Sequence, residues 1–301
     1  MPLPLQLYSK IRERNEHRME KANMMTGLKA FAAQIRCETL KELANLGFGH
    51  VGGAMSIVET LAVLYGEEMK IDPKNPKWED RDWYVQSKGH AGPAIYATLA
   101  LKGYFPMDWL LTLNQGGTNL PSHCDRNKTP GIDMTTGSLG QGVSLAVGVA
   151  AALKMDKKDN RVFLMVGDGE LNEGQCWEGA MFASAKKLDN LVMFVDWNKQ
   201  QLDGNTKDVL DMGDLSAKFT AFGFDTQVVN GHCVEAIYDA IQNAKAVEGK
   251  PHCIILDTIK GYGCSAAEGV VPNHHIAFKP GQLDADIARW QAEYEKLSAA
   301  L

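Results

Sequence analysis

The stretch RVFLMVGDGE, residues 161–170, decides the fold of this chain of 301 residues. Its apolar run, Val162–Val166, has the length of a buried strand and ends at a Gly-Asp-Gly turn. An apolar run bounded by turn residues is typical of a parallel strand that is covered on both faces. Leu191–Val195 and Cys253–Leu256 have the same character, and helical patterns flank them. The sequence therefore predicts an α/β domain with a doubly wound, mostly parallel sheet and helices on both faces.

Helical periodicity surrounds these strands. Apolar residues recur at helical spacing from Met25 to Leu46, and we expect a single domain, residues 1–301, with a helical extension over about residues 1–24. Ser56, with Glu59 three residues later, predicts the N-cap of a second helix. The remaining predictions are a strand at Gln227–Val229, helices at Val234–Ala244 and Leu283–Leu301, and a loop over Gly261–Pro280.

The composition argues against several classes of partner. Lysine and arginine number 31 against 37 acidic residues, and this net charge of −6 disfavours a nucleic-acid surface or an anionic membrane as the main partner. No apolar run approaches the roughly 18–20 residues of a membrane span, and the charged N-terminus lacks the pattern of a secretory signal. The six cysteines are scattered without a CxxC pair, so we expect reduced thiols in a cytoplasmic protein.

Polar residues at two of the predicted strand ends indicate a metal and phosphate site. Asp168 follows the first strand, and Asn198 follows the strand that comes next in the chain. A carboxylate beside a neutral amide suits Mg²⁺ or Ca²⁺ whose charge a diphosphate already compensates. Gly169 leaves room for a phosphate, and the following helix offers free N–H groups. A Gly-Asp-Gly turn alone is common in proteins without a ligand, but the second strand end favours a site.

This spacing resembles the thiamine diphosphate signature, in which an Asp, an Asn and a backbone carbonyl two residues after the Asn hold a divalent metal. The resemblance implies that Asp168, Asn198 and the carbonyl of Gln200 bind Mg²⁺, with Ca²⁺ or Mn²⁺ as substitutes. Gly167 and Gly169 would lie beside the diphosphate. Transketolases share this signature with 2-oxoacid decarboxylases and dehydrogenases, so the signature alone does not define the reaction.

Three histidine segments narrow the resemblance to the transketolase family. GHVGG around His50, SKGHA around His90 and LPSH ending at His123 resemble the family's histidine loops, and KTPGIDMTTGSLGQG, residues 128–142, follows as in the family. A lone histidine is more often structural, but each of these lies in a loop marked by glycine or proline, where its ring can face a cleft. The resemblance implies that His90 faces the diphosphate, and that His50 and His123 meet the donor sugar's hydroxyls and the developing alkoxide.

Other segments carry further implications of the resemblance. In the family the loop Gly137, Ser138 and Leu139 contacts the thiamine aminopyrimidine, although a helix entry without a ligand is the alternative. Glu173 and Glu178 occupy positions where transketolases place buried carboxylates between two thiamine sites. First-turn acids that favour the helix dipole explain these two glutamates nearly as well.

The last motif, Asn273-His274-His275, resembles a family loop that supplies a histidine near the diphosphate. This sequence has two adjacent histidines there, and the choice between them is open. We favour His274 as the catalytic residue and keep His275 as a cofactor contact. The segment NGHC, residues 230–233, departs from the family's acidic pattern, and we assign it no role.

The resemblance implies a transketolase, which transfers a two-carbon ketol unit from a ketose, usually phosphorylated, to an aldose. The family's pyrimidine-binding domain carries the glutamate that protonates the aminopyrimidine, and it has no counterpart before Leu301. We therefore expect a separate C-terminal subunit, in an assembly of two copies of each chain. Two alternatives are the alpha subunit of a 2-oxoacid dehydrogenase, which the SKGH and KTPG segments disfavour, and a non-catalytic thiamine-binding subunit. The sequence does not define the donor or the acceptor sugar.

Overall fold

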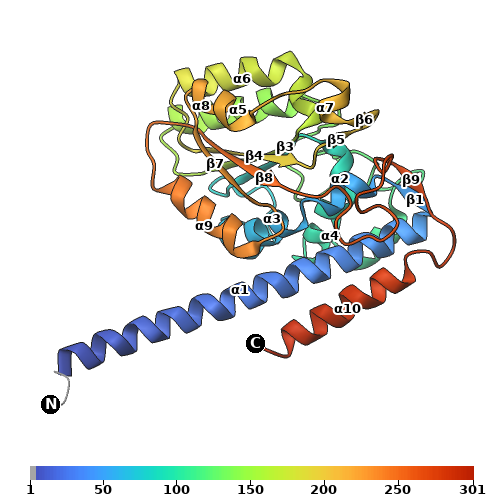
Figure 1. Ribbon diagram of the computed structural model, residues 1–301, viewed down its shortest axis with the longest axis horizontal. Coiled ribbons are helices and arrows are strands. Elements are labelled where there is room, and N and C mark those ends of the chain that lie inside the picture. Colours follow the sequence, from blue (N-terminus) through green and yellow to red (C-terminus); the bar gives the residue numbers. More distant parts are fainter. Residues whose placement is uncertain (1–4) are drawn as a thin grey trace.

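The computed structural model describes the backbone of residues 5–301 and the side chains of residues 19–301. Five parallel strands form its central sheet in the order β2-β3-β4-β8-β7, and two ribbons of two strands each, β1-β9 and β5-β6, lie outside that sheet (Figure 1). The strands are β1 (Phe48–Gly49), β2 (Trp83–Gln86), β3 (Val162–Gly167), β4 (Leu191–Trp197), β5 (Gln200–Gln201), β6 (Gly204–Asn205), β7 (Asp225–Asn230), β8 (His252–Asp257) and β9 (Ile276–Ala277). The predicted α/β fold is confirmed.

Helices cover both faces of the sheet (Figure 1). On one face lie α1 (Leu5–Leu46), α2 (Val51–Met55), α3 (Val58–Val63), α4 (Gly92–Leu101), α9 (Val234–Lys245) and α10 (Asp284–Ser298). On the other lie α5 (Gln141–Met155), α6 (Gly174–Ala185) and α8 (Leu215–Ala221), and α7 (Thr206–Val209) follows the β5-β6 ribbon. Short turns of π helix (Leu64–Glu68) and 3-10 helix (Gly89–Ala91, Met107–Thr112 and Gly169–Asn172) connect them.

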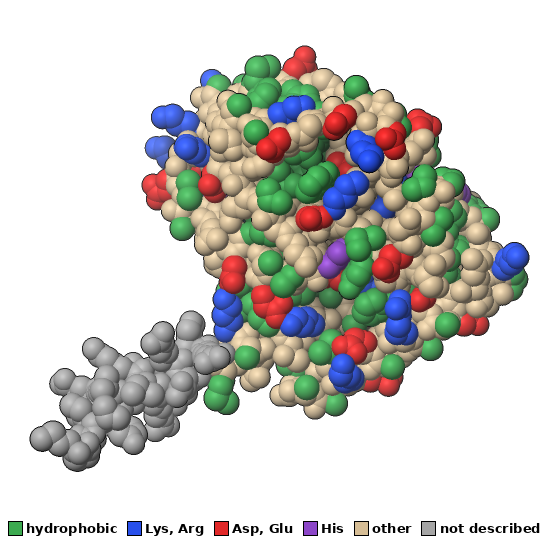
Figure 2. Space-filling view, viewed as in Figure 1, with side chains coloured by type: hydrophobic (Ala, Val, Ile, Leu, Met, Phe, Trp, Pro, Cys, Tyr) green, Lys and Arg blue, Asp and Glu red, His purple; other side chains and the backbone are tan. Residues whose placement is uncertain are grey.

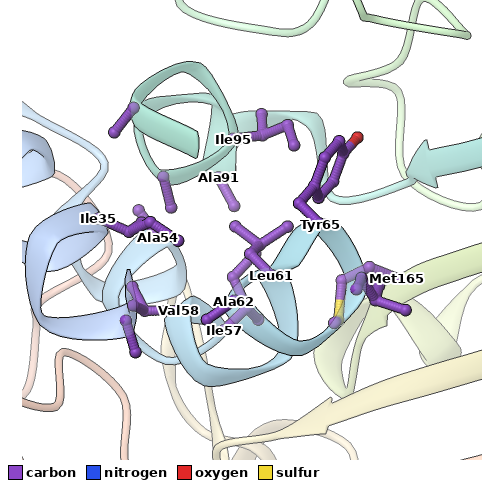
Figure 3. Close-up of a cluster of buried hydrophobic side chains, with 14 of the residues drawn as sticks. Ile35, Ala54, Ile57, Val58, Leu61, Ala62, Tyr65, Ala91, Ile95 and Met165 are labelled. Atoms are coloured by element: carbon purple, nitrogen blue, oxygen red, sulfur yellow. The ribbon is translucent and has the colours of Figure 1, made fainter. Parts of the chain in front are cut away.

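The strand β3 shows why its sequence is continuously apolar. Phe163 and Met165 point into the core beneath α1, α3 and α4, whereas Leu164 and Val166 point into the core beneath α5 and α6. Successive strand residues face opposite sides of a sheet, so a strand that is buried on both sides needs an apolar residue at every position. Figure 3 shows part of the first core, where Leu61 lies among the other labelled side chains with Met165 nearby.

The helix α1 runs unbroken over 42 residues, so the predicted helix Met25–Leu46 is its C-terminal part. The helix α10 lies along it (Figure 1). Residues 1–4 of the predicted extension lie outside the described residues. Neither α1 nor any other helix in the described part of the chain is both long and apolar enough to cross a membrane. On the face in Figure 2, acidic and basic side chains are interspersed rather than gathered by sign.

Two local predictions are wrong. Ser56 does not begin a helix: it ends α2, and α3 starts at Val58. At an N-cap its hydroxyl would accept a hydrogen bond from a backbone N–H, but Ser56 is fully buried and its hydroxyl donates to the Asp196 carboxylate (2.6 Å). The segment Gly261–Pro280 is not loop throughout, because β9 within it pairs with β1. The short strand β2, at the edge of the sheet, went unpredicted.

Glu42 on α1 is a buried carboxyl whose two oxygens have no hydrogen-bond partner among the described residues. Burial, and then Glu38, raises its pKa well above the ordinary 4.5. A raised folded-state pKa means that stability falls as the pH rises above 4.5, because the unfolded chain then releases a proton that the folded chain keeps.

We therefore predict that Glu42→Met increases the free energy of unfolding at pH 8 by about 1–3 kcal/mol, the cost of an unsatisfied buried polar group. The gain should shrink as the pH is lowered toward 4.5, because the carboxyl then becomes increasingly protonated in the unfolded chain as well. Urea unfolding at both pH values measures it. Glu248→Met, at an exposed loop position, is the control and should change little. A loss of stability in the Glu42 variant at pH 8 would contradict the prediction.

Candidate active site

A cavity of about 300 Å³ opens at the C-terminal ends of β3 and β4. This is the edge at which open α/β sheets bind ligands. The lining combines predicted site residues with others that were not predicted. The predicted ones are His90, Leu139, Gly167, Asp168, Gly169, Glu173, Asn198, Gln200 and His274. The others are Gly53, Lys88, Glu170, Asn172, Gln201, Leu202 and Lys260.

Asp168 lies at the end of β3, next to the end of β4. The register pairs Gly167 with Asp196, so the two strand ends are adjacent. Within the described residues, the Asp168 carboxylate accepts hydrogen bonds from the backbone N–H groups of Gly169 (2.8 Å) and Lys199 (2.6 Å). Burial, and then the nearby Asp196, raises its pKa to about 7. A buried carboxylate held only by neutral donors is a site where a cation is stabilised.

Asn198 is held in one orientation by its own neighbours. Its Nδ2 donates to Asp196 Oδ2 (2.8 Å), and its Oδ1 accepts from the Gln200 N–H (3.1 Å). Lys199, between them, has a φ of 64°, which turns the chain sharply after β4. Asp168, Asn198 and Gln200 thereby line one cavity, as the predicted metal site requires.

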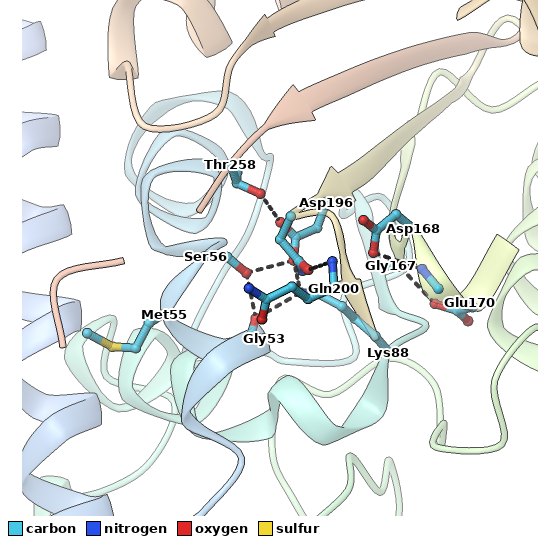
Figure 4. Close-up of polar contacts among 12 residues, drawn as sticks. Gly53, Met55, Ser56, Lys88, Gly167, Asp168, Glu170, Asp196, Gln200 and Thr258 are labelled. Carbon is cyan, nitrogen blue, oxygen red and sulfur yellow. Dashed lines mark hydrogen bonds and ion pairs between the residues drawn. The ribbon is translucent and has the colours of Figure 1, made fainter. Parts of the chain in front are cut away.

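Asp196 is the fully buried centre of this edge (Figure 4). Its Oδ2 accepts hydrogen bonds from Ser56 Oγ (2.6 Å), Lys88 Nζ (2.5 Å) and Asn198 Nδ2 (2.8 Å), and its Oδ1 accepts one from Thr258 Oγ1 (2.5 Å). Burial acts to raise its pKa, but Lys88 and the hydroxyl donors outweigh burial, so the pKa is lowered. Asp196 is therefore a charged carboxylate that joins four separate segments of the chain.

Two lysines line the cavity. Lys88 is buried and donates to the Gly53 carbonyl (2.8 Å) as well as to Asp196. Burial lowers the pKa of Lys260 to about 8, with Asp168 acting to raise it and Lys88 to lower it. Sequence reasoning assigned no role to either lysine. Their only signal in the sequence is their position, Lys88 in the SKGH segment and Lys260 at the start of the segment KGYG, residues 260–263, because their partners lie far away in the chain.

Glu170 was also missed, and it ties the loop before α5 to the sheet. Its Oε1 accepts from Ser87 Oγ and from the Gly140 N–H (2.9 Å), while its Oε2 accepts from the Gly167 N–H (3.0 Å). Burial raises its pKa, and these donors act against that shift. The Glu170 carboxylate thus bonds to the backbone immediately after Leu139 and immediately before Asp168. It therefore fixes the positions of these two cavity-lining residues relative to each other.

Five histidines form a cluster, and two of them, His90 and His274, line the cavity. The ring centroid of His50 lies 5.5 Å from His90, 5.4 Å from His123, 5.3 Å from His274 and 4.7 Å from His275. His90 and His274 are 4.5 Å apart. These rings come from the start of α2, the 3-10 turn Gly89–Ala91, the loop that contains His123 and the segment before β9, which are spread over more than 200 residues. Of the two adjacent histidines, His274 lines the cavity, whereas His275 is exposed and packs against Phe48 as well as His50.

The histidine cluster favours neutral imidazoles. Burial, followed by His274, lowers the pKa of His50 to about 3, and burial, followed by Lys260, lowers that of His274 to about 4. Burial also lowers the pKa of His90 well below its ordinary value and lowers that of His123. At neutral pH these four rings are uncharged, and each can donate one hydrogen bond and accept another.

The remaining predicted residues differ in position. Leu139 and Glu173 line the cavity, whereas Gly137 lies against His123, where a Cβ would come within 2.9 Å of the imidazole Cδ2. Ser138 is exposed outside the cavity lining. Glu178 likewise lies outside it, on α6, and both Glu173 and Glu178 are exposed in the single chain. The roles of these residues stay predictions.

A bound metal would have a mixed set of oxygen ligands. Within the described part of the chain, no group of three or more His, Cys, Asp or Glu side chains is arranged to hold an ion. A cation beside Asp168 would therefore receive one carboxylate, with further oxygens from the Asn198 amide and the Gln200 carbonyl. The single negative charge of Asp168 would only partly neutralise a divalent ion, so the ion could also bind an anionic ligand. This arrangement is typical of Mg²⁺ bound with a phosphate. The residues fit a metal diphosphate.

Comparison with known proteins agrees with this chemistry. Residues 28–297 match the family described as "Transketolase, thiamine diphosphate binding domain". The fold and the match together define a thiamine diphosphate binding domain. The chain belongs to the transketolase family, and the predicted resemblance to its N-terminal, diphosphate-binding subunit is confirmed.

The similar proteins fall into two length classes. The chain is 52% identical over 259 residues to the 6-deoxy-6-sulfo-D-fructose transketolase subunit of a Clostridium species, covering 86% of this chain and 94% of that protein. It is 42% identical over 236 residues to an apulose-4-phosphate transketolase subunit from Actinobacillus succinogenes, covering 78% and 85%. Among solved structures, a Pichia stipitis transketolase mutant with fructose 6-phosphate matches with a TM-score of 0.80 at 28% identity, over 91% of this chain. The chain spans only 44% of that structure. The Leishmania mexicana transketolase matches with a TM-score of 0.78 at 31% identity, and the chain spans 45% of it.

The buried pair of Lys88 and Asp196 yields a stability prediction. Lys88→Met should lower the free energy of unfolding by about 3–5 kcal/mol, because it leaves the Asp196 charge buried without its cation. Urea unfolding of the chain measures the change. Lys158→Met removes an exposed pair with Asp80 and is the matched control, for which little change is expected. Equal effects of the two substitutions would show that the buried pair is not a major contributor.

Proposed function

We propose that this chain is the thiamine diphosphate-binding subunit of a two-chain transketolase, which transfers a two-carbon ketol unit from a ketose to an aldose. The observation that carries the proposal is the shared cavity, in which Asp168, Asn198 and Gln200 lie within reach of the histidine cluster. The near-complete coverage of relatives named as subunits supports the division into two chains. Membership of the transketolase family disfavours the 2-oxoacid dehydrogenase alternative.

The cofactor would be held at the sheet edge. Asp168, Asn198 and the carbonyl of Gln200 would bind Mg²⁺, and Gly169 with the Lys260 ammonium would contact the diphosphate. Bound thiamine diphosphate supplies an electron sink that makes cleavage of a carbon–carbon bond possible. The glycine at position 169 has a structural reason, because a Cβ there would come within 2.7 Å of the Gln201 side chain. The bond from Lys199 N–H to Asp168 holds the turn that presents Gln200.

The neutral histidines would handle the donor sugar. His50 and His123 lie beside the cavity-lining rings of His90 and His274, so hydroxyl groups of a bound ketose would meet donors and acceptors on several sides. A neutral imidazole can accept a hydrogen bond from a hydroxyl and donate one to an alkoxide. This sequence has two adjacent histidines in the loop where the family supplies one. The second of them, His275, packs against His50 and would support it.

The donor is proposed to be a ketose with an anionic end. The two relatives above are named for 6-deoxy-6-sulfo-D-fructose and for apulose 4-phosphate, substrates that carry a sulfonate and a phosphate. The higher identity to the first makes a sulfonated ketose the first donor to test. The partner would be a C-terminal subunit with the pyrimidine-binding domain, in an assembly of two copies of each chain. A cytoplasmic location suits the six free thiols.

The test is reconstitution with the partner chain. The purified pair, supplied with thiamine diphosphate and Mg²⁺, should transfer a ketol unit from 6-deoxy-6-sulfofructose to an aldose acceptor, while this chain alone should not. Fructose 6-phosphate serves as the comparison donor, and pyruvate decarboxylation as the assay for the rival reaction. Cofactor binding without transfer from any ketose would favour the non-catalytic alternative and overturn the proposal.

A substitution tests the metal assignment directly. Asp168→Ala should raise the dissociation constant of thiamine diphosphate with Mg²⁺ on the order of 100-fold or more, since changes to groups that merely orient metal ligands already cost about 10–100-fold in metal affinity. Asp156→Ala, at an exposed position after α5, is the control and should bind as wild type does. Calorimetric titration measures binding, and circular dichroism checks the fold. A folded Asp168 variant with unchanged affinity would show that the ligand assignment is wrong.

A further inference from the structure

A second group of charged and aromatic side chains, of which Arg36 and Glu59 are buried and His232 and Tyr262 half-buried, lies next to the segment that carries Lys260. Arg36, Glu59, His232 and Tyr262, which we call the Arg36 cluster, line a separate cavity of about 340 Å³ that shares no lining residue with the first. The Arg36 guanidinium is fully buried, pairs with Glu59 and donates to the Tyr262 carbonyl (2.6 Å). The proposed reaction uses none of these residues, so their charges need another explanation.

Glu59 is a charged carboxylate shared by two partners. Burial acts to raise its pKa, but Arg36 and then His232 outweigh burial, so the pKa is lowered. One oxygen pairs with Arg36, and the other lies 3.4 Å from His232 Nδ1. The sequence predicted that Glu59 helps to cap a helix that begins at Ser56. In the structure Glu59 instead orients a histidine from a distant loop.

His232 has a defined tautomer. Its Nε2 accepts a hydrogen bond from the Ile259 backbone N–H (2.9 Å), so that nitrogen carries no hydrogen. The proton of the ring is then on Nδ1, directed at Glu59. The ring also stacks on Tyr262, with centroids 3.8 Å apart. Gly231 allows the loop to come this close, because a Cβ there would lie 2.4 Å from Thr258 Cγ2.

The Ile259 amide lies between two other attachments of the same segment. On one side, Thr258 Oγ1 donates to Asp196 (2.5 Å), and on the other, the Gly261 N–H donates to the Gly52 carbonyl (3.0 Å). Between these fixed points, Lys260 sends its side chain into the first cavity. His232 bonds to the backbone of the residue immediately before Lys260, and so it limits how far that lysine can shift.

We propose that His232, oriented by Glu59, is a positioning residue: it fixes the backbone at Ile259 and thereby holds the Lys260 ammonium where the cavity receives its anionic ligand. The inference rests on the proposed function only in taking that ligand to be thiamine diphosphate. His232 itself touches no ligand in this arrangement. The segment NGHC, which had no role at the level of sequence, acquires one through its contact with the segment that bears Lys260.

The first test separates the hydrogen bond from the shape of the ring. His232→Phe keeps a ring to stack on Tyr262 but has no acceptor, whereas His232→Gln restores an amide oxygen to face Ile259. In the full chain with its partner, the Phe substitution should raise the dissociation constant of thiamine diphosphate with Mg²⁺ about 5-fold, the net contribution of one hydrogen bond. The Gln substitution should recover most of that affinity.

Matched controls and a second variant keep the result interpretable. His252 is a buried histidine beside Asp225 at the start of β8, whereas Ile259 follows the end of that strand, and His252→Phe should leave cofactor affinity unchanged. Should His232→Phe fail to fold, His232→Asn takes its place, because its shorter amide does not reach Ile259. An equal loss of affinity in the Phe and Gln variants of His232 would overturn the proposal.

A double-mutant cycle asks whether His232 acts through Lys260. If it does, Lys260→Met alone weakens cofactor binding, and adding His232→Phe to it causes no further loss. Non-additivity of this kind is the signature of two residues that share one interaction. An undiminished effect of His232→Phe in the Lys260→Met background would show that the histidine acts independently, and would overturn the proposal.

Amide hydrogen exchange supplies a readout that needs no cofactor. Exchange at Ile259 and Lys260 should be faster in His232→Phe than in wild type, and His232→Gln should slow it again. If wild type binds no thiamine diphosphate while exchange behaves in this way, the proposed function fails and the positioning role survives. If exchange at Ile259 is unchanged in His232→Phe, the positioning role fails whatever the cofactor does.

Discussion

The buried carboxylate of Asp196 is the constraint on which the rest of the site depends. A single charged group accepts hydrogen bonds from the end of α2, the loop after β2, the turn after β4 and the segment after β8. Burying a lone carboxylate is costly, and here Lys88 supplies the opposite charge within the same dry environment. Because all four segments satisfy one group, a shift in any of them leaves a buried charge under-coordinated. The cavity geometry is therefore set by electrostatics inside the protein before any ligand arrives.

The features that could be predicted from sequence are those whose signal is local. Asp168 and Asn198 each follow an apolar strand directly, and parallel strand ends meet at one edge, so their proximity follows from the pattern. His50, His90 and His123 could be singled out because each lies in a loop marked by glycine or proline. The resemblance to the transketolase family then assigned them to one site, and the structure brings their rings within contact of one another.

The features that could not be predicted depend on partners far away in the chain. Ser56 followed by Glu59 has the local pattern of a capping box, yet the Ser56 hydroxyl bonds to a carboxylate 140 residues later, and Glu59 pairs with Arg36 on another helix. Lys88 is 108 residues from Asp196, and no periodicity in the sequence connects them. The choice between His274 and His275 likewise depends on which ring the loop turns inward, which β9 and its pairing with β1 help to fix.

The opposed pKa shifts at the cavity show which charges on a ligand would suit it. Burial raises the pKa of Asp168 to about 7 and lowers that of Lys260 to about 8, so the dry environment penalises the charged form of both groups. A cation beside Asp168 would favour its ionised form, and an anion beside Lys260 would do the same for the ammonium. A metal ion alone would add repulsion at Lys260, and a free anion would add repulsion at Asp168. A ligand that carries both charges, such as the metal-bound diphosphate proposed above, would relieve both penalties at once.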